Sequence, residues 1–375
     1  MKRYDSLSDR IKRIYQHSIT GWGRLVLPLL LFCCVFATAV PVVDAAAAAR
    51  NTVVTGNRQS VPARAKGAAL RYGDTIGIAA PASPGGGDTS AAVQLLHSLG
   101  YQVVEGTMAA GHYGFFAGTD EQRAADLNAL FKDDTVKAIV CLNGGYGSAR
   151  ILDKLDYAMI SQHPKPLIGF SDITALHTAL GEKAGIVTVH GPLMVTLNPA
   201  NHSAYTERQF ADGLAATAPI GTLALPAGRK LSTVVSGTAG GILAGGNLTM
   251  LAAAAGTPYE LRGDGAILVL EDVNEAAYRI DRMMQQLWQN GLLKRVSAIV
   301  YGDFLDCGND PGDFTTEEVL TYYARLAGKP AVKGAPVGHG MDNAFLPFGV
   351  HAVVRANADG TASLTIDENH NTIGS

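Results

Sequence analysis

Three polar residues and one glycine-rich segment each follow an apolar segment with the composition of a buried strand. Ser171 follows PLIGF, Glu271 follows AILVL, and His339 follows APVG. The glycine-rich segment NGGYG (residues 143–147) follows AIVCL. Because ligands of open α/β sheets bind beyond the carboxyl ends of the strands, we expect these three residues and this segment to lie close together. A serine, a carboxylate and an imidazole in one place indicate acyl transfer by an activated serine.

Acyl transfer by serine requires a base for the hydroxyl proton and a carboxylate that orients this base. Ser171 lies between a predicted strand and a predicted helix with no room for a loop, as in a nucleophile elbow, although GFSDI lacks the second glycine of that motif. Backbone amides at Asp172 and at Gly144 or Gly145 are the predicted oxyanion donors. Asn247 is a further candidate for substrate binding.

Each of these residues also has a purely structural interpretation. Ser171 is in the position of a helix N-cap. Glu271 could pair with Arg279 or Arg282. His339 lies between two glycines of a predicted turn. His190, in TVHGP, is a second candidate for the base. The residue types by themselves leave these alternatives open.

The elements that must position these residues alternate regularly in the first half of the chain. Helices, one of them SARILDKL, separate five predicted strands: TIGIAA, YQVVEG, VKAIVCLN, KPLIGF and IVTVHG. Thr119 and Gln122 form a predicted capping box. Continuous apolar strands that alternate with helices predict a parallel sheet covered on both faces. We therefore expect an α/β domain over residues 69–200.

The second half of the chain predicts a mixed α/β domain over residues 232–375. Residues 201–231 interrupt the alternation and are predicted to connect the two domains. A long amphipathic helix is expected over about 274–290, and a capped helix from Thr315. Strands are expected at GAILVLE, VSAIVYGDF and GAPVGH, followed by a closing hairpin with an Asp-Gly turn.

Residues 1–45 have the order of a secretory signal. A basic region precedes the apolar run Leu25–Val43, and small residues follow it. The predicted localisation is therefore export, with the periplasm as the expected compartment. The apolar run approaches the length of a membrane span, so an inner-membrane anchor is the alternative, and membrane contact is expected only in that case. Residues 46–68 are predicted to be a flexible lead-in.

The composition narrows the classes of partner. The 375 residues are 47% hydrophobic and 17% charged, enough for two domains with sizeable cores. Without residues 1–45, which hold 6 basic and 3 acidic residues, 24 basic and 30 acidic residues remain, a net charge of −6. This balance argues against a nucleic-acid partner. No cysteine or histidine spacing indicates a metal site, and Cys141 is expected to be a buried free thiol.

Eight segments, in order, resemble the LD-carboxypeptidases, serine peptidases that include murein tetrapeptide carboxypeptidases and microcin C immunity peptidases. The resemblance covers nearly all of residues 70–370. The segments are IAAPASP, FFAGTDEQRAADLNALF, NGGYGSARIL, IGFSDITAL, HGPL, GGNLTML, LVLEDVNEAAYRIDRM and VGHG.

The resemblance implies a Rossmann-like N-terminal domain, a smaller C-terminal α/β domain and an active site at their interface. It implies Ser171 as the nucleophile, Glu271 as the carboxylate and His339 as the base, which disfavours His190. Many members have arginine where this chain has Asn143.

The implied reaction is hydrolysis of the bond between an L-centre and D-alanine at the end of a murein tetrapeptide stem. The resemblance implies that the reaction needs no metal or cofactor. It also implies a homodimer. Arg279 is a candidate partner for the terminal carboxylate of the substrate. One alternative is a peptidase that cleaves aminoacyl-nucleotide amides. Another is a periplasmic ligand-binding protein without catalysis.

Overall fold

The computed structural model describes residues 63–373. The predicted signal, residues 1–45, lies outside the described residues, as does most of the predicted lead-in. The described end of the lead-in differs from the flexible segment we predicted, because Ala65 forms a β-bridge with Ile186. Within residues 63–373, no helix is long and apolar enough to cross a membrane.

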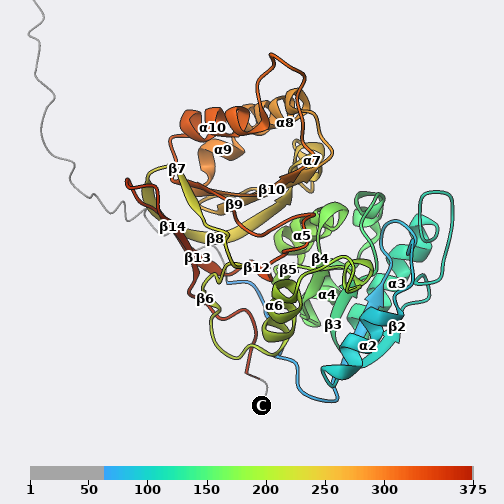
Figure 1. The fold of residues 1–375 in the computed structure, drawn as a ribbon. Helices are drawn as coiled ribbons and strands as arrows, with labels where there is room; N and C mark the ends of the chain where they lie inside the picture. Colours follow the sequence, from blue (N-terminus) through green and yellow to red (C-terminus); the bar gives the residue numbers. More distant parts are fainter. Residues whose placement is uncertain (1–62, 374–375) are drawn as a thin grey trace, which may run out of the picture. The chain divides into compact units, whose positions relative to one another are not determined.

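The first sheet has six strands, of which five are parallel (Figure 1). Their order is β2-β1-β3-β4-β5, and β12 pairs antiparallel with β5 at the edge. The strand order reverses between β1 and β3, the position at which open α/β sheets bind ligands. The strands are β1 (Thr75–Ala79), β2 (Gln102–Glu105), β3 (Val136–Cys141), β4 (Leu167–Gly169), β5 (Thr188–His190) and β12 (Leu346–Phe348).

Helices cover both faces of this sheet, as predicted. On β3, Ile139 packs in the same core as residues of α3 and α5, whereas Val140 packs with residues of α2 and α6. This alternation confirms that the strand is buried on both sides. The helices are α2 (Ser90–Ser98), α3 (Asp120–Lys132), α4 (Tyr157–Gln162), α5 (Thr174–Ala179) and α6 (Ala204–Ala215).

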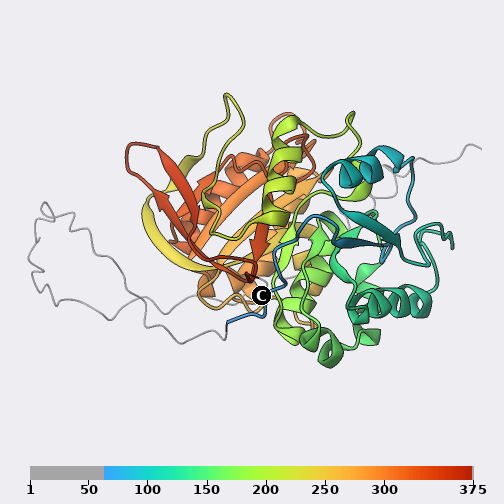
Figure 2. The same ribbon diagram turned by 90° about the horizontal axis from the view of Figure 1, so that it is seen from below.

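The second sheet has eight strands in the order β6-β14-β13-β8-β9-β10-β11-β7, with a parallel centre from β8 to β11. Figures 1 and 2 show the closing hairpin β13–β14 beside β8. The strands are β6 (Gly221–Thr222), β7 (Ser232–Val235), β8 (Gly237–Asn247), β9 (Ile267–Val273), β10 (Ala298–Leu305), β11 (Ala331–Lys333), β13 (His351–Ala356) and β14 (Ala362–Ile366).

Four helices cover one face of the second sheet, and the other face packs against β12 of the first sheet. The helices are α7 (Leu248–Ala254), α8 (Ala277–Gln289), α9 (Leu292–Arg295) and α10 (Thr316–Ala327). The two sheets therefore confirm an α/β fold with a parallel first half and a mixed second half. The predicted domain boundaries stay predictions.

Three local predictions differ from the structure. The predicted strand GAPVGH is a loop, and the strand there is β11, because Pro336 has no N–H for a ladder and Gly338 has a φ of +129°. The predicted helix SARILDKL is a 3-10 helix over Ser148–Lys154. The predicted connection 201–231 contains the helix α6, whose Ser203 side chain accepts a hydrogen bond from the Thr206 amide.

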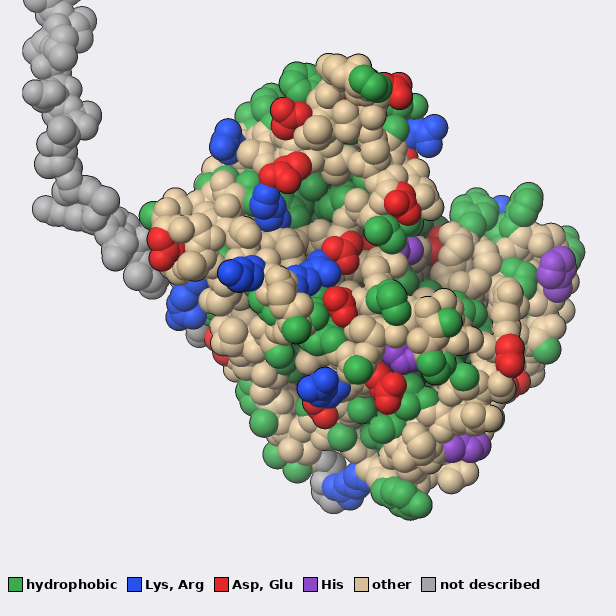
Figure 3. Space-filling model, in the orientation of Figure 1, with side chains coloured by type: hydrophobic (Ala, Val, Ile, Leu, Met, Phe, Trp, Pro, Cys, Tyr) green, Lys and Arg blue, Asp and Glu red, His purple; other side chains and the backbone are tan. Residues whose placement is uncertain are grey.

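Other local predictions are confirmed. Both capping boxes are present, with Thr119 and Thr315 as the N-caps. Cys141 is a buried free thiol, and burial raises its pKa. The face seen in Figure 3 carries lysine and arginine side chains scattered among acidic ones.

Candidate active site

Ser171 has a left-handed backbone conformation, with a φ of +63°, where β4 passes into the 3-10 helix Ser171–Ile173. Such a conformation costs a non-glycine residue about 1–3 kcal/mol, so its surroundings must hold it. Ser148 does so, because its amide donates to Asp172 Oδ2 at 2.8 Å and its hydroxyl donates to the Asp172 carbonyl at 2.5 Å. The result is the sharp strand-to-helix turn that the sequence predicts for a nucleophile.

The glycine-rich segment after β3 lies directly against this serine. A Cβ atom at Gly144 would lie 3.1 Å from Ser171 Cβ, so the approach suits glycine. The Gly144 amide already donates to the side-chain oxygen of Asn143 at 2.9 Å. Among the hydrogen bonds of residues 63–373, none uses the amides of Gly145 or Asp172. These two amides are therefore the available oxyanion donors.

Glu271, near the carboxyl end of β9, and His339 form a hydrogen-bonded pair. Glu271 is fully buried, and its Oε2 lies 2.8 Å from Nδ1 of His339. A Cβ atom at Gly338 would lie only 2.9 Å from Glu271 Oε2, so glycine permits this approach. Burial raises the pKa of Glu271, and the hydrogen bond and charge of His339 oppose that shift.

A ring contact brings this pair to the nucleophile turn. The ring of Phe170, the residue before Ser171, meets the imidazole of His339 edge-on, with 4.8 Å between ring centroids. The His339 side chain remains 19% exposed. The serine, the histidine and the carboxylate predicted from sequence are thus brought to one place, where the two sheets meet.

A buried hydrogen-bond network joins the two sheets beside Ser171. The Asn247 amide donates to Thr174 Oγ1 at 2.9 Å, and the Asn247 side chain donates to Asp272 at 3.0 Å and accepts from the Met250 amide at 3.2 Å. Asn247 is only 4% exposed. Its side chain therefore caps α7 and stabilises the junction, which differs from the substrate contact that we predicted.

Arg279 lies apart from this group on α8. Its guanidinium lies 3.5 Å from Glu275 Oε2 and donates to the hydroxyl of Tyr278 at 3.1 Å. No hydrogen bond or ion pair within residues 63–373 joins Arg279 to the serine, glutamate or histidine described above. Tyr278 also lines a cavity of about 890 Å³ whose other lining residues include Asp281, Asp306, Asp310, Asp313 and Glu318. The negative charge of this cavity does not suit a substrate carboxylate.

His190, the rival base, is fully buried in the first sheet. Neither of its ring nitrogens has a hydrogen-bond partner in the described part of the chain. Burial holds the pKa of His190 well below its usual value, and His177 and His339 lower it further. Without a carboxylate partner or access to solvent, His190 is a poor candidate for the base.

Sequence reasoning missed three residues that shape the site: Phe170, Ser148 and Thr174. All three lie within segments already singled out, Ser148 in NGGYGSARIL and the other two in IGFSDITAL. The polar atoms of Ser148 and Thr174 bond across 24 and 73 residues of chain, and spacing does not reveal such contacts.

Two family models match the chain. The LD-carboxypeptidase N-terminal domain matches residues 76–191, and the LD-carboxypeptidase C-terminal domain matches residues 240–354. The chain belongs to the LD-carboxypeptidase family. A probable murein peptide carboxypeptidase of Bacillus subtilis is 37% identical over 301 residues, which are 76% of this chain and 90% of that protein.

Solved structures of two kinds resemble this chain. The muramoyltetrapeptide carboxypeptidase from Oxalobacter formigenes has a TM-score of 0.70 and 30% identity, covering 78% of this chain and 99% of its own. The microcin C7 self immunity protein MccF, in complex with aspartyl sulfamoyl adenosine, has a TM-score of 0.74 and 25% identity, covering 82% and 100%. The likeness spans both sheets of this LD-carboxypeptidase.

Proposed function

We propose that this protein is a serine LD-carboxypeptidase that removes the terminal D-alanine from murein tetrapeptide stems. The observation that carries the proposal is the Glu271–His339 pair, held by the Phe170 ring beside the strained Ser171. The names of the similar Bacillus subtilis and Oxalobacter formigenes proteins support murein peptides as the substrate. A base oriented by a buried carboxylate, next to a half-buried turn serine, is the arrangement that acyl transfer needs.

In the proposed reaction, Ser171 Oγ attacks the scissile carbonyl carbon while His339 accepts the hydroxyl proton. The amides of Gly145 and Asp172 donate to the oxyanion that forms. The C–N bond then breaks, and His339 returns the proton to the nitrogen of the leaving D-alanine. A water molecule, deprotonated by His339, hydrolyses the acyl-enzyme and releases the tripeptide.

Glu271 acts through His339 in both halves of this reaction. Its Oε2 accepts the hydrogen bond from His339 Nδ1–H, which leaves Nε2 as the basic nitrogen. Because Glu271 is buried, its negative charge is poorly solvated and interacts strongly with the imidazolium that forms. The carboxylate therefore fixes the tautomer and stabilises the charged intermediate.

A second candidate is cleavage of aminoacyl-nucleotide amides, which the likeness to the microcin C7 self immunity protein favours. Both reactions use the same three residues, so the substrate distinguishes them. A ligand-binding protein without catalysis would leave the Glu271–His339 pair and the strained Ser171 without a purpose.

Export to the periplasm and a homodimer are also parts of the proposal. The order of basic, apolar and small residues in 1–45 supports export. Cell fractionation with an antibody against the protein tests the compartment, and light scattering of the purified full chain tests the dimer. Recovery in the cytoplasm, or a monomer at working concentration, would contradict the respective part.

The experiment that tests the function compares wild type, Ser171→Ala and Ser161→Ala on a murein tetrapeptide, with products followed by mass spectrometry. Ser161 is an exposed serine of α4 and serves as the control. Wild type and the control are expected to release one alanine, and Ser171→Ala is expected to be slower by about 10³-fold or more. If all three leave the tetrapeptide intact, the proposed function is wrong; if Ser171→Ala retains activity, the nucleophile is wrong.

A further inference from the structure

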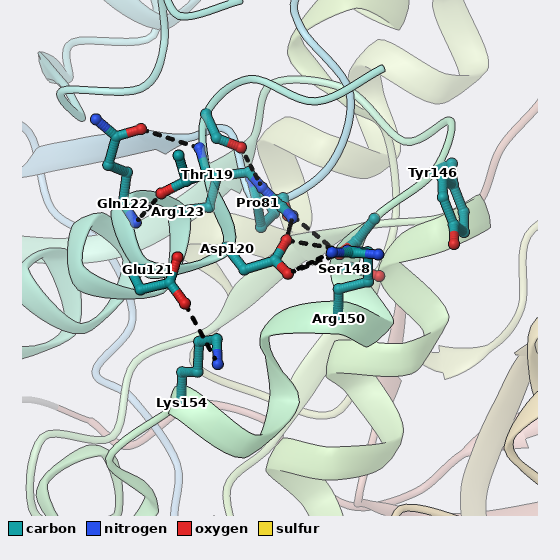
Figure 4. A network of polar contacts seen from close by, with 12 residues as sticks. Pro81, Thr119, Asp120, Glu121, Gln122, Arg123, Tyr146, Ser148, Arg150 and Lys154 are labelled. Atoms are coloured by element: carbon teal, nitrogen blue, oxygen red, sulfur yellow. Dashed lines mark hydrogen bonds and ion pairs between the residues drawn. The ribbon is translucent and has the colours of Figure 1, made fainter. Parts of the chain in front are cut away.

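A charged group next to the nucleophile turn is not used by the reaction steps above. In Figure 4, the carboxylate of Asp120 lies between the guanidinium groups of Arg123 and Arg150, and Tyr146 lies on the other side of Arg150. Asp120 accepts hydrogen bonds from Arg150 Nε at 3.1 Å and from Arg150 Nη2 at 2.8 Å. Arg123 pairs with the same carboxylate at 2.5 Å.

The two arginines differ in what they offer to a ligand. Arg123 is only 1% exposed and also donates to the carbonyl groups of Gly118 and Gly147 at 3.1 Å and 2.9 Å. The Arg150 side chain is 50% exposed. Since two guanidinium groups share one carboxylate, the group carries a net positive charge, and Arg150 presents this charge to solvent.

Arg150 keeps some of the N–H groups of its guanidinium available to a ligand. Asp120 takes the N–H groups of Nε and one of Nη2, and the Tyr146 hydroxyl interacts with the same guanidinium. Other N–H groups of Nη1 and Nη2 remain for a second acceptor. The Phe116 ring lies 5.2 Å from Arg150 Cζ and 5.6 Å from the Tyr146 ring, and it restricts both side chains. A fixed guanidinium edge beside a phenol hydroxyl matches the geometry of a carboxylate.

The loop of residues 144–148 carries Tyr146, and both ends of this loop contact the nucleophile turn. Gly144 lies against Ser171, and Ser148 bonds to Asp172. In a peptide cleaved at its last bond, the free carboxylate lies only about 4 Å from the scissile carbonyl carbon. A cation that recognises this carboxylate must therefore belong to the loops around Ser171.

We infer that Arg150, with Tyr146, binds the free C-terminal carboxylate of the peptide and so restricts the enzyme to the last residue of the chain. This inference rests on the proposed function and replaces Arg279 as the candidate for this contact. Arg279 pairs with Glu275 beside an acidic cavity, whereas Arg150 lies beside the loop that contacts Ser171.

The test compares a murein tetrapeptide with the same peptide amidated at its C-terminus. Wild type is expected to prefer the acid by about 30-fold in kcat/KM, the size of a charge-assisted bidentate contact. Arg150→Met is expected to lower kcat/KM for the acid only, so that the preference falls to about one. Lys154→Met, which removes one charge from the same segment, is expected to keep the wild-type preference. Retention of the preference in Arg150→Met, or its loss in Arg279→Met instead, would overturn the inference.

A binding measurement separates this inference from the proposed function. If wild type cleaves neither peptide, the proposed function fails, and calorimetric titration of Ser171→Ala with both peptides then tests the site directly. Tighter binding of the acid, abolished by adding Arg150→Met, would support the carboxylate site. Equal binding of acid and amide, or no binding of either, would overturn it.

Discussion

Two histidines contact the ring of Phe170 and have opposite surroundings. His339 follows the second sheet, keeps 19% of its side chain exposed, and lies 2.8 Å from the carboxylate of Glu271. His190 ends β5 of the first sheet, is fully buried, and has no hydrogen-bond partner for either ring nitrogen within residues 63–373. Their ring centroids lie 4.8 Å and 5.8 Å from that of Phe170.

This comparison shows that nearness to the nucleophile does not make a histidine a base. A base must become cationic during the reaction, and burial disfavours the cation unless an anion compensates for it. Glu271 supplies that anion for His339. Burial, as the largest cause, holds the pKa of His190 well below its usual value, so His190 stays neutral and acts as a packing residue.

The largest expected effect separates the two histidines directly. His339→Gln is expected to lower kcat by about 10⁴-fold or more, because it removes the group that accepts the serine proton. His190→Gln is expected to lower kcat by less than about 10-fold. Steady-state kinetics on the tetrapeptide measures both. Similar losses in the two variants would mean that the difference in surroundings does not decide the role.

A smaller loss is expected when the partner of His339 is changed. Glu271→Gln keeps the shape of the side chain but removes its charge, and its amide no longer fixes the useful tautomer. We expect kcat to fall by about 10³-fold, with KM changed much less. The crystal structure of the variant serves as the control for the position of His339. An unchanged kcat would show that the carboxylate does not act through the histidine.

The smallest expected effect concerns the free energy of unfolding, and it arises from two buried histidines, His177 and His190. Burial lowers the pKa of His177 to about 4, and the pKa of its neighbour His190 is also lowered. Because the pKa of His177 is lower in the folded protein than its usual value of about 6.5, the unfolded chain gains the proton first as the pH falls. The free energy of unfolding is therefore highest above pH 6.5, and it decreases by about 3 kcal/mol for His177 as the pH falls to the folded-state pKa.

Urea unfolding at about pH 7.5 and pH 4.5 measures this loss. His190→Gln is expected to lose less stability than wild type on acidification, because glutamine has no proton to gain. His97→Gln, which changes an exposed histidine of α2, is expected to lose as much as wild type. An equal loss in all three proteins would contradict a buried, neutral His190.

Much of the fold could be predicted because its signals are local. The parallel first sheet, the capping boxes at Thr119 and Thr315 and the closing hairpin follow from strand hydrophobicity and turn chemistry. The predictions failed where short-range preference was weak, as in the loop after β11 and the helix α6. In these two regions, the positions of proline and glycine and the long-range packing decide the conformation of the backbone.

The sequence by itself determined which residues can do chemistry: Ser171 at a strand-to-helix junction, and Glu271 and His339 after apolar segments. Only the tertiary structure decided how they work, because the contacts join distant parts of the chain. The Glu271–His339 bond spans 68 residues, and the Thr174–Asn247 bond spans 73. The same holds for burial, which separates His339 from His190 although apolar residues precede both in the sequence. The surroundings of a side chain depend on the packing of two sheets.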